Sequence, residues 1–316
     1  MPMDAINQLF NIKYPIVQGG MIWCSGWELA SAVSNSGGLG LIGSGSMYQD
    51  VLRNQIRKCK QATNNPFGVN VPLLYPNIED HMKIIVEEGV KIVFTSAGNP
   101  KTWTQHLKDN GITVVHVVSN IKFAIKCQEA GVDAIVAEGF EAGGHNGREE
   151  TTTMVLIPSV KKHINIPLIA AGGIGSGHAI AAAMALGAQG VQIGSRFAAT
   201  KESSAHENFK QAIIDAKEGD TKLSLKQLTP VRLLKNEFYN KVDDLEKKGA
   251  SVDELSHLLG RGRSKLGMFE GNMHEGELEI GQVSGDINKL QTVEEVMQEL
   301  VIDFNATINK IGKYSL

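Results

Sequence analysis

The sequence has little cysteine, little proline and no block of charge of one sign. Three cysteines among 316 residues, with no Cys-x-x-Cys spacing, argue against a disulfide framework and against a zinc site. The 31 basic and 34 acidic residues give a net charge of −3, which argues against a nucleic-acid partner and against an anionic membrane surface. The N-terminus, MPMDAINQLF, lacks a basic region followed by an apolar run, so we expect a cytoplasmic protein.

One long stretch lacks charge altogether. No Asp, Glu, Lys or Arg occurs from His163 to Ser195, which exceeds the roughly 20 residues that a membrane helix needs. Glycines and Pro167 divide this stretch into an expected strand, loop, helix and strand. The sequence therefore predicts a segment buried by protein and no membrane span.

Short apolar runs recur along the first two thirds of the chain, and each is followed by a glycine or polar break and a helix-like pattern. Their starts lie 21 to 34 residues apart, the length of a strand, a helix and two loops. Buried strands that alternate with helices predict a parallel α/β sheet, and eight units can close into a (β/α)8 TIM barrel. An open doubly wound sheet is the alternative. The runs are Ile16–Gln18, Leu39–Gly43, Phe67–Val71, Ile92–Thr95, Thr113–Val118, Ala134–Ala137, Leu168–Ala171 and Val191–Gly194.

The period is lost after the eighth run. Residues 204–273 are polar and helix-prone, and Ser251-Val-Asp-Glu254 has the capping-box pattern, so we expect a small helical insert or lid after strand 8. A second capping box, Thr292-Val-Glu-Glu295, predicts a C-terminal helix that docks on the barrel through one apolar stripe, Val296, Leu300, Phe304 and Ile308.

Two domains are expected from this pattern. Residues 1–203 together with 277–316 would form the barrel and its docking helix. Residues 204–276 would form a small helical substrate or lid domain.

Glycine-rich strings occur at three expected strand ends or starts. Gly38-Leu39-Gly40-Leu41-Ile42-Gly43 matches GxGxxG, but it follows a helix and enters a strand, so a close helix-to-strand turn is the better interpretation. Ala171-Gly172-Gly173-Ile174-Gly175 and Gln192-Ile193-Gly194-Ser195 end the seventh and eighth strands. In barrels these two loops commonly bind a phosphate through backbone N–H groups, and Ser195 adds a hydroxyl donor.

His145 is the strongest candidate for acid–base chemistry. It lies in Glu138-Gly-Phe-Glu-Ala-Gly-Gly144-His145-Asn-Gly, at the C-terminal end of the sixth strand, where barrel active sites sit. His116 lies inside the fifth strand. The favoured interpretation is a core histidine whose ring nitrogens are hydrogen-bonded within the protein, and the alternative is a histidine that contacts a ligand. No HxxxH or HExxH spacing supports a metal site.

Residues of two further strands are expected at the same C-terminal end of the barrel. Gly20 and Met21 end the first strand, and Asn70 lies in the third. A glycine, an amide and a polarizable thioether suit a flat heterocycle, and core packing is the alternative explanation.

Seven strings appear in order over residues 15–197: PIVQGGMIW, NSGGLGLIG, PFGVN, TSAGNP, AEGFEAGGHNG, IAAGGIG and VQIGSRF. With these strings the chain resembles the flavin-dependent nitronate monooxygenase (2-nitropropane dioxygenase) superfamily, which includes the FabK-type enoyl-acyl-carrier-protein reductases. Later residues, including Lys201-Glu202-Ser203, Val231-Arg232 and Gly281-Gln282, resemble the FabK branch most. Residues 243–276 align poorly with that pattern.

The resemblance implies a barrel that binds FMN. It implies that Gly20, Met21 and Asn70 lie beside the isoalloxazine, with Glu138 and Gly144 near the flavin or its ribityl chain. It also places Gly172, Gly173, Gln192, Gly194 and Ser195 around the phosphate. His145 matches the catalytic histidine of the family, and Ser195 stands where threonine is common.

The resemblance also implies an activity. The first hypothesis is an FMN-dependent enoyl-[acyl-carrier-protein] reductase in fatty-acid biosynthesis, with NADH or NADPH as co-substrate and an enoyl thioester, free or carrier-bound, as acceptor. A nitronate monooxygenase that oxidises alkyl nitronates with O₂ is the alternative, and a barrel that only binds a phosphorylated ligand is a third.

Two expectations concern macromolecular partners. A homodimer is expected from the resemblance. A group of basic residues is a candidate dock for the acidic carrier protein, with a solvated charged face as the alternative: Arg232, Lys235, Arg261, Arg263 and Lys265.

Overall fold

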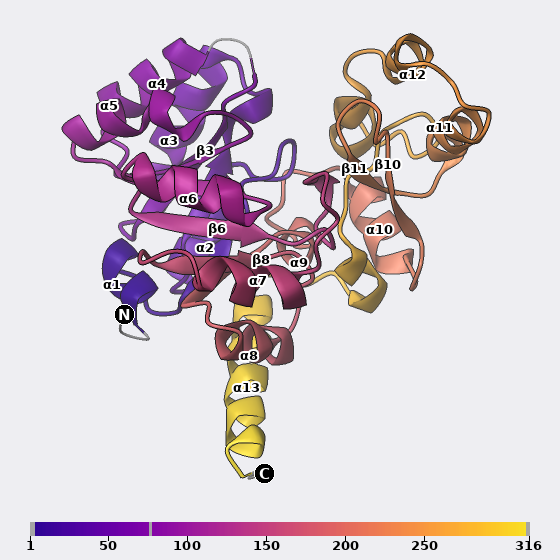
Figure 1. The fold of residues 1–316 in the computed structure, drawn as a ribbon. Helices are drawn as coiled ribbons and strands as arrows, with labels where there is room; N and C mark the ends of the chain where they lie inside the picture. The colour runs from indigo at the N-terminus through magenta and orange to yellow at the C-terminus, as the bar shows by residue number, and fades with distance from the viewer. Residues whose placement is uncertain (1–3, 76–77, 314–316) are drawn as a thin grey trace.

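The computed structural model describes residues 4–75 and 78–313, and its centre is a ring of eight parallel strands (Figure 1). The strands are hydrogen-bonded in the order β1-β9-β8-β6-β5-β4-β3-β2. Val17 of β1 bridges to Leu39 just before β2, where Leu39 N donates to Ile16 O at 2.9 Å. The sheet therefore closes on itself as a TIM barrel, and the open doubly wound alternative is wrong. The strands are β1 (Ile16–Gln18), β2 (Gly40–Gly43), β3 (Phe67–Pro72), β4 (Ile92–Ser96), β5 (Thr113–Val118), β6 (Ala134–Glu138), β8 (Leu168–Ala171) and β9 (Gly190–Ile193).

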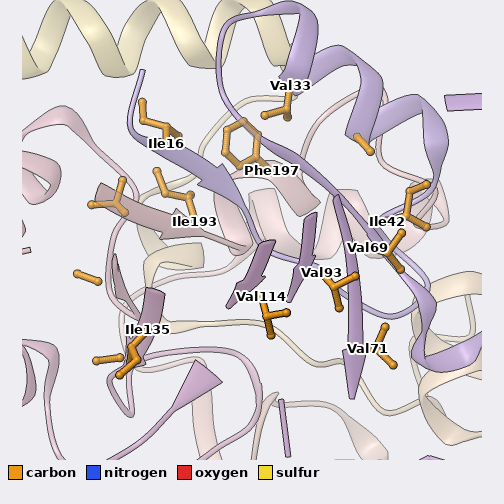
Figure 2. Close-up of a cluster of buried hydrophobic side chains, with 14 of the residues drawn as sticks. Ile16, Val33, Ile42, Val69, Val71, Val93, Val114, Ile135, Ile193 and Phe197 are labelled. Carbon is orange, nitrogen blue, oxygen red and sulfur yellow. The ribbon is translucent and has the colours of Figure 1, made fainter. Parts of the chain in front are cut away.

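Helices surround the strands and cover their outer face. Alternate strand residues, such as Ile42, Val69 and Val93, belong to the same buried apolar cluster as helix residues such as Val33 (Figure 2). The helices are α2 (Trp27–Asn35), α3 (Gln49–Ala62), α4 (Ile78–Glu87), α5 (Thr104–Asp109), α6 (Ile121–Glu129), α7 (Thr153–Lys161) and α8 (Gly177–Ala185). Single turns occur at η1 (Ser44–Ser46), η2 (Pro100–Thr102), α9 (Ser195–Ala198) and η4 (Gln282–Asp286).

The other strand residues fill the barrel interior. Val17, Leu41, Val115 and Ile169 belong to one apolar cluster that also contains residues of α1 (Ala5–Phe10). The rings of Phe10 and Phe94 lie 5.8 Å apart, so α1 closes the end of the barrel where the strands begin. The C-terminal end of the strands is left for the functional loops.

The insert contains helices, as expected, and also a β-hairpin that was not predicted. Its elements are α10 (Glu207–Asp215), β10 (Thr221–Ser224), β11 (Val231–Leu234), α11 (Glu237–Lys247), α12 (Val252–Leu259) and a π-helical turn, η3 (Lys265–Phe269). Strand β11 also pairs antiparallel with β7 (Gly144–His145), which comes from the barrel. The insert and a barrel loop thus share one three-stranded sheet.

The C-terminal helix α13 (Val293–Ile311) packs on α8 and α2. Both predicted capping boxes form, at Ser251 and at Thr292. Val296 and Leu300 are buried, but Ile308 is 45% exposed because the end of α13 runs past α8 (Figure 1). The predicted apolar stripe is therefore wrong at its last position.

The uncharged stretch from His163 to Ser195 folds as β8, α8 and β9. Over residues 4–75 and 78–313 no helix has the length and apolarity that crossing a bilayer would need. In the GxGxxG string, a side chain on Gly40 would collide with the backbone of Ala30 in α2, so this glycine serves close helix packing, as expected.

Candidate active site

A cavity of about 960 Å³ opens at the C-terminal end of the barrel strands. Its walls come from the loops after β1, β3, β4, β5, β6, β8 and β9, with Pro230 and Met268 of the insert on the far side. All eleven site residues expected from the sequence line this cavity: Gly20, Met21, Asn70, Glu138, Gly144, His145, Gly172, Gly173, Gln192, Gly194 and Ser195.

The wall formed by β1 and β3 is held together by amide and hydroxyl groups. Asn70 Nδ2 donates to Gly20 O at 3.2 Å, and Ser44 Oγ donates to Asn70 O at 2.8 Å. A side chain at Gly20 would collide with Asn70 Cβ, so the residue must be glycine for these loops to meet. Gln18, which is fully buried, donates to Ser25 Oγ at 2.8 Å and accepts from Leu41 N at 3.0 Å.

The glycines after β8 adopt backbone conformations that other residues rarely take. Gly172 and Gly173 have φ values of +87° and +69°, and a Cβ on Gly172 would lie 2.5 Å from Gly139 O. A Cβ on Gly194 would lie 3.6 Å from Met21 Sδ, an ordinary van der Waals contact. Ser195 Oγ accepts from Gly281 N at 2.9 Å, and no acceptor for its O–H is found in the described part of the chain. The backbone N–H groups of these loops and the Ser195 hydroxyl are the candidate anion donors of this part of the cavity.

The loop after β6 is tied to the insert through main-chain pairing. His145 lies opposite Val231 and Gly144 opposite Arg232. Asn146 Nδ2 donates to Ala142 O at 2.9 Å and to Gly144 O at 3.0 Å, and Asn146 N donates to Pro230 O at 2.8 Å. The position of the His145 backbone therefore depends on the insert hairpin.

Arg232 of β11 also binds the loop after β6 through hydrogen bonds. Its Nε and one terminal nitrogen donate to Phe140 O at 3.1 and 2.8 Å, and its guanidinium lies 5.0 Å from the Phe140 ring centroid. Because Arg232 is buried, it cannot belong to an exposed carrier-protein dock. The expected basic group is wrong at this position, whereas Lys235 and Lys265 are on the surface.

His145 faces the cavity with its side chain accessible, yet protein surrounds it closely. Burial lowers the pKa of this imidazole, and the carboxylate of Glu277 opposes that effect. Glu138 lines the same cavity, and burial raises its pKa to about 7. The pKa of Glu138 therefore lies near neutral pH, where proton transfer is efficient.

Two acidic residues near His145 were missed by the sequence analysis. Glu279 lines the cavity, and Glu277 is 9% exposed beside it. Burial raises the pKa of both carboxyls. Their signal was the alternation Gly276-Glu-Leu-Glu-Ile-Gly281, which puts both glutamates on one face of an extended segment.

His116 lies on the cavity floor, and its Nδ1 is 2.7 Å from Thr95 Oγ1. Burial lowers its pKa to about 4, so the imidazole is neutral near pH 7. The hydrogen bond with Thr95 agrees with the favoured interpretation of a hydrogen-bonded core histidine. The ring also borders the cavity. No cluster of metal-ligating side chains occurs among residues 4–75 and 78–313.

The sequence profile of the nitronate monooxygenase family matches residues 4–303. The chain belongs to this family. A FabK structure from Thermotoga maritima is 40% identical and superposes with a TM-score of 0.94 over 98% of each chain. A probable nitronate monooxygenase from Staphylococcus saprophyticus is 34% identical over 76% of this chain and 81% of its own length.

A third relative from Rhodococcus jostii is 30% identical over 98% of this chain and 97% of its own length. It is named (3aS,4S,5R,7aS)-5-hydroxy-7a-methyl-1-oxo-octahydro-1H-indene-4-carboxyl-CoA dehydrogenase. Membership of this family and the likeness to FabK make the chain an oxidoreductase. The relatives carry different activities, so the reaction is a matter for the geometry of the site.

Proposed function

We propose that the chain is an FMN-dependent enoyl-thioester reductase of the FabK type that uses NADH or NADPH. The observation that carries this proposal is the likeness to the Thermotoga FabK over 98% of both chains, insert included. The insert contributes to the cavity and to the placement of His145, so likeness there bears on substrate recognition. The Rhodococcus relative, named for a carboxyl-CoA compound, supports a thioester substrate.

The cavity suits FMN on structural grounds. Its volume lies within the range of ligand pockets, and its polar groups converge at the strand ends. Gly172, Gly173, Gly194 and Ser195 would hold the phosphate through N–H and O–H donors. Gly20, Met21 and Asn70 would flank the flat ring, with Gln192, Glu138 and Gly144 completing the pocket.

The chemistry supplied by bound FMN is two-electron transfer from the nicotinamide to the β-carbon of the enoyl thioester. The residues of the chain position the acceptor and manage the proton. His145 lies at the cavity on the insert side, where its imidazole can give a proton to the α-carbon or polarise the thioester carbonyl. The insert covers this side of the cavity and helps to exclude water from the reacting atoms.

His145→Ala tests the assigned role. We expect the rate of crotonyl-CoA reduction by the FMN-loaded protein to fall about 10²- to 10⁴-fold, because general acid catalysis contributes that much. His163→Ala is the control, since that side chain lies on the surface and bonds Ser159 O. An unchanged rate of thioester reduction in His145→Ala would show that the histidine has another role.

Nitronate oxidation is the second candidate, favoured by the family match and the Staphylococcus relative. The two activities differ in what reduces the flavin. Holoprotein mixed anaerobically with NADH or NADPH should lose its yellow colour if the chain is an enoyl reductase. Bleaching by an alkyl nitronate alone, with none by either nicotinamide, would favour the monooxygenase. A protein that stays colourless with added FMN would contradict both.

A further inference from the structure

The cavity continues past the residues assigned to FMN. In the ring of strands, β8 and β9, which carry the expected phosphate loops, stand opposite β4 and β3. Around that opposite side, five residues that the FMN assignment does not use also line the cavity. We call these residues the outer wall: Ala97 after β4, Ser119 after β5, Phe123 and Lys126 of α6, and Arg148 after β7.

The loops that carry the outer wall are fixed to one another. Glu149 accepts hydrogen bonds from Asn120 Nδ2 at 2.7 Å and from Ser119 Oγ at 3.4 Å. A Cβ on Gly147 would lie 2.3 Å from Ser119 Cβ, so the two loops meet in close contact. Asn120 also caps α6 by accepting from Phe123 N at 2.8 Å. The first turn of α6 is therefore held beside the loop after β7.

The two basic residues of the outer wall have no acidic partner. Over residues 4–75 and 78–313, neither Lys126 nor Arg148 forms an ion pair with a carboxylate. Glu149 is held by the amide and hydroxyl donors described above, and Glu150 pairs with Lys226. Arg148 donates to two backbone oxygens between β10 and β11, at 3.0 and 2.6 Å, which leaves other N–H donors of its guanidinium for an anion. The outer wall therefore offers positive charge to the cavity.

Phe123 adds an exposed aromatic ring to this wall. Its side chain lines the cavity and is 47% exposed. Lys126 lies one turn further along α6, and its Nζ is 5.9 Å from the centre of the Phe123 ring. An acyl chain would use the ring but would leave both cations without a partner. An aromatic ring beside two cations suits a nucleobase that carries phosphates, because the base stacks on the ring and the phosphates accept from the cations.

We propose that the outer wall binds the adenosine diphosphate portion that NAD(P)H and coenzyme A thioesters share. Phe123 stacks on the adenine, and Lys126 and Arg148 donate to the phosphates. The proposal rests on the proposed function, which supplies both ligands. It puts the adenosine end of the ligand across the ring from the FMN phosphate loops, with the reactive end directed toward the flavin residues.

ADP is the probe for binding, titrated by calorimetry into the FMN-loaded protein. Phe123→Ala should weaken ADP binding about five- to hundredfold, because stacking on the ring is lost. Phe123→Trp keeps an aromatic ring and should retain binding. Lys126→Ala should weaken binding about two- to fivefold, the effect of one exposed charge pair. Added salt should lower the affinity of the wild type more than that of Lys126→Ala, because salt screens the charge that this variant lacks.

Lys122→Ala is the matched control. This lysine is also exposed on the first turn of α6, but it does not line the cavity. The variant should bind ADP as tightly as the wild type. Unfolding temperature and FMN content establish that each variant folds and holds the cofactor.

Truncated substrates distinguish the two sources of the adenosine diphosphate. Reduced nicotinamide mononucleotide lacks the adenylate of NADH, and crotonyl-pantetheine lacks the adenosine phosphates of crotonyl-CoA. If the outer wall holds the dinucleotide, Phe123→Ala raises KM for NADH and leaves KM for the mononucleotide unchanged. If it holds coenzyme A, the variant raises KM for crotonyl-CoA and leaves KM for crotonyl-pantetheine unchanged. Either pattern supports the proposal.

The proposal is overturned if the wild type does not bind ADP, or if Phe123→Ala and Lys126→Ala bind it as tightly as Lys122→Ala does. It is also overturned if an active enzyme has the same four KM values in Phe123→Ala as in the wild type. Failure of the proposed function looks different, since neither NADH nor NADPH would then bleach the flavin and no thioester would be reduced. The ADP titration does not depend on turnover and still decides whether the outer wall binds a nucleotide.

Discussion

Gly172→Ala would probe the expected phosphate loop at its most constrained point. Gly172 has φ +87°, and an added Cβ would meet Gly139 O at 2.5 Å and Gly139 N at 3.0 Å. A side chain in this backbone region costs about 1–3 kcal/mol. Relieving the contact with Gly139 costs about 1–3 kcal/mol more, because backbone must shift. The free energy of unfolding should therefore fall by about 2–6 kcal/mol.

The chain offers a matched control for this substitution. Gly131 has a similar φ of +81°, but a Cβ there would meet nothing within 4 Å. Gly131→Ala should therefore cost only the backbone strain, about 1–3 kcal/mol. The difference between the two variants, measured by urea unfolding of the apoproteins, isolates the close approach of Gly172 to Gly139.

The affinity for FMN distinguishes a change in the geometry of the loop from a change in the stability of the fold. If Gly172 N–H is displaced, one hydrogen bond to a charged phosphate is lost, worth about 1.5–3 kcal/mol. Quenching of FMN fluorescence should then show roughly ten- to hundredfold weaker binding in Gly172→Ala and wild-type binding in Gly131→Ala. Wild-type affinity in Gly172→Ala, or equal losses in both variants, would refute a phosphate site in this loop.

Two more predictions concern stability. Burial lowers the pKa of His116 from 6.5 to about 4 on folding. The neutral imidazole therefore contributes fully to the free energy of unfolding above pH 6.5, and this contribution is lost as pH falls toward 4. Urea unfolding should show about 3 kcal/mol of this loss in the wild type and not in His116→Gln; parallel pH profiles would contradict it. Thr292→Ala should cost about 1 kcal/mol, since Thr292 caps Glu295 N, whereas Thr152→Ala, at an N-cap without a side-chain bond, should cost less. Equal costs in thermal unfolding would contradict the capping argument.

The barrel could be predicted because its signals are local. Each strand is an apolar run buried on both faces, and each is separated from the next by a helix with one apolar stripe. Leu52, Ile56 and Cys59 on α3, for example, are all buried. A closed parallel barrel requires this repeat, and the C-terminal ends of its strands then meet at one mouth. For that reason residues as distant as Gly20 and Ser195 could be assigned to one cavity.

The insert resisted prediction because its pairing is not local. The strands β10 and β11 have only four residues each, and Thr221 and Lys222 of β10 are not buried. The third strand of that sheet, β7, comes from a glycine-rich barrel loop whose sequence indicates a turn. Glu277 and Glu279 were missed for a related reason, since no rule of strand ends points to a segment after the insert.

The pairing of β7 with β11 has a consequence for how this protein can be altered. His145 lies on β7, whose partner strand β11 belongs to the insert that also lines the cavity. Grafting a different module onto this barrel to change acceptor preference would also re-aim the imidazole. A redesigned insert would therefore have to preserve the pairing of Val231 with His145 in order to keep the position of this histidine at the cavity.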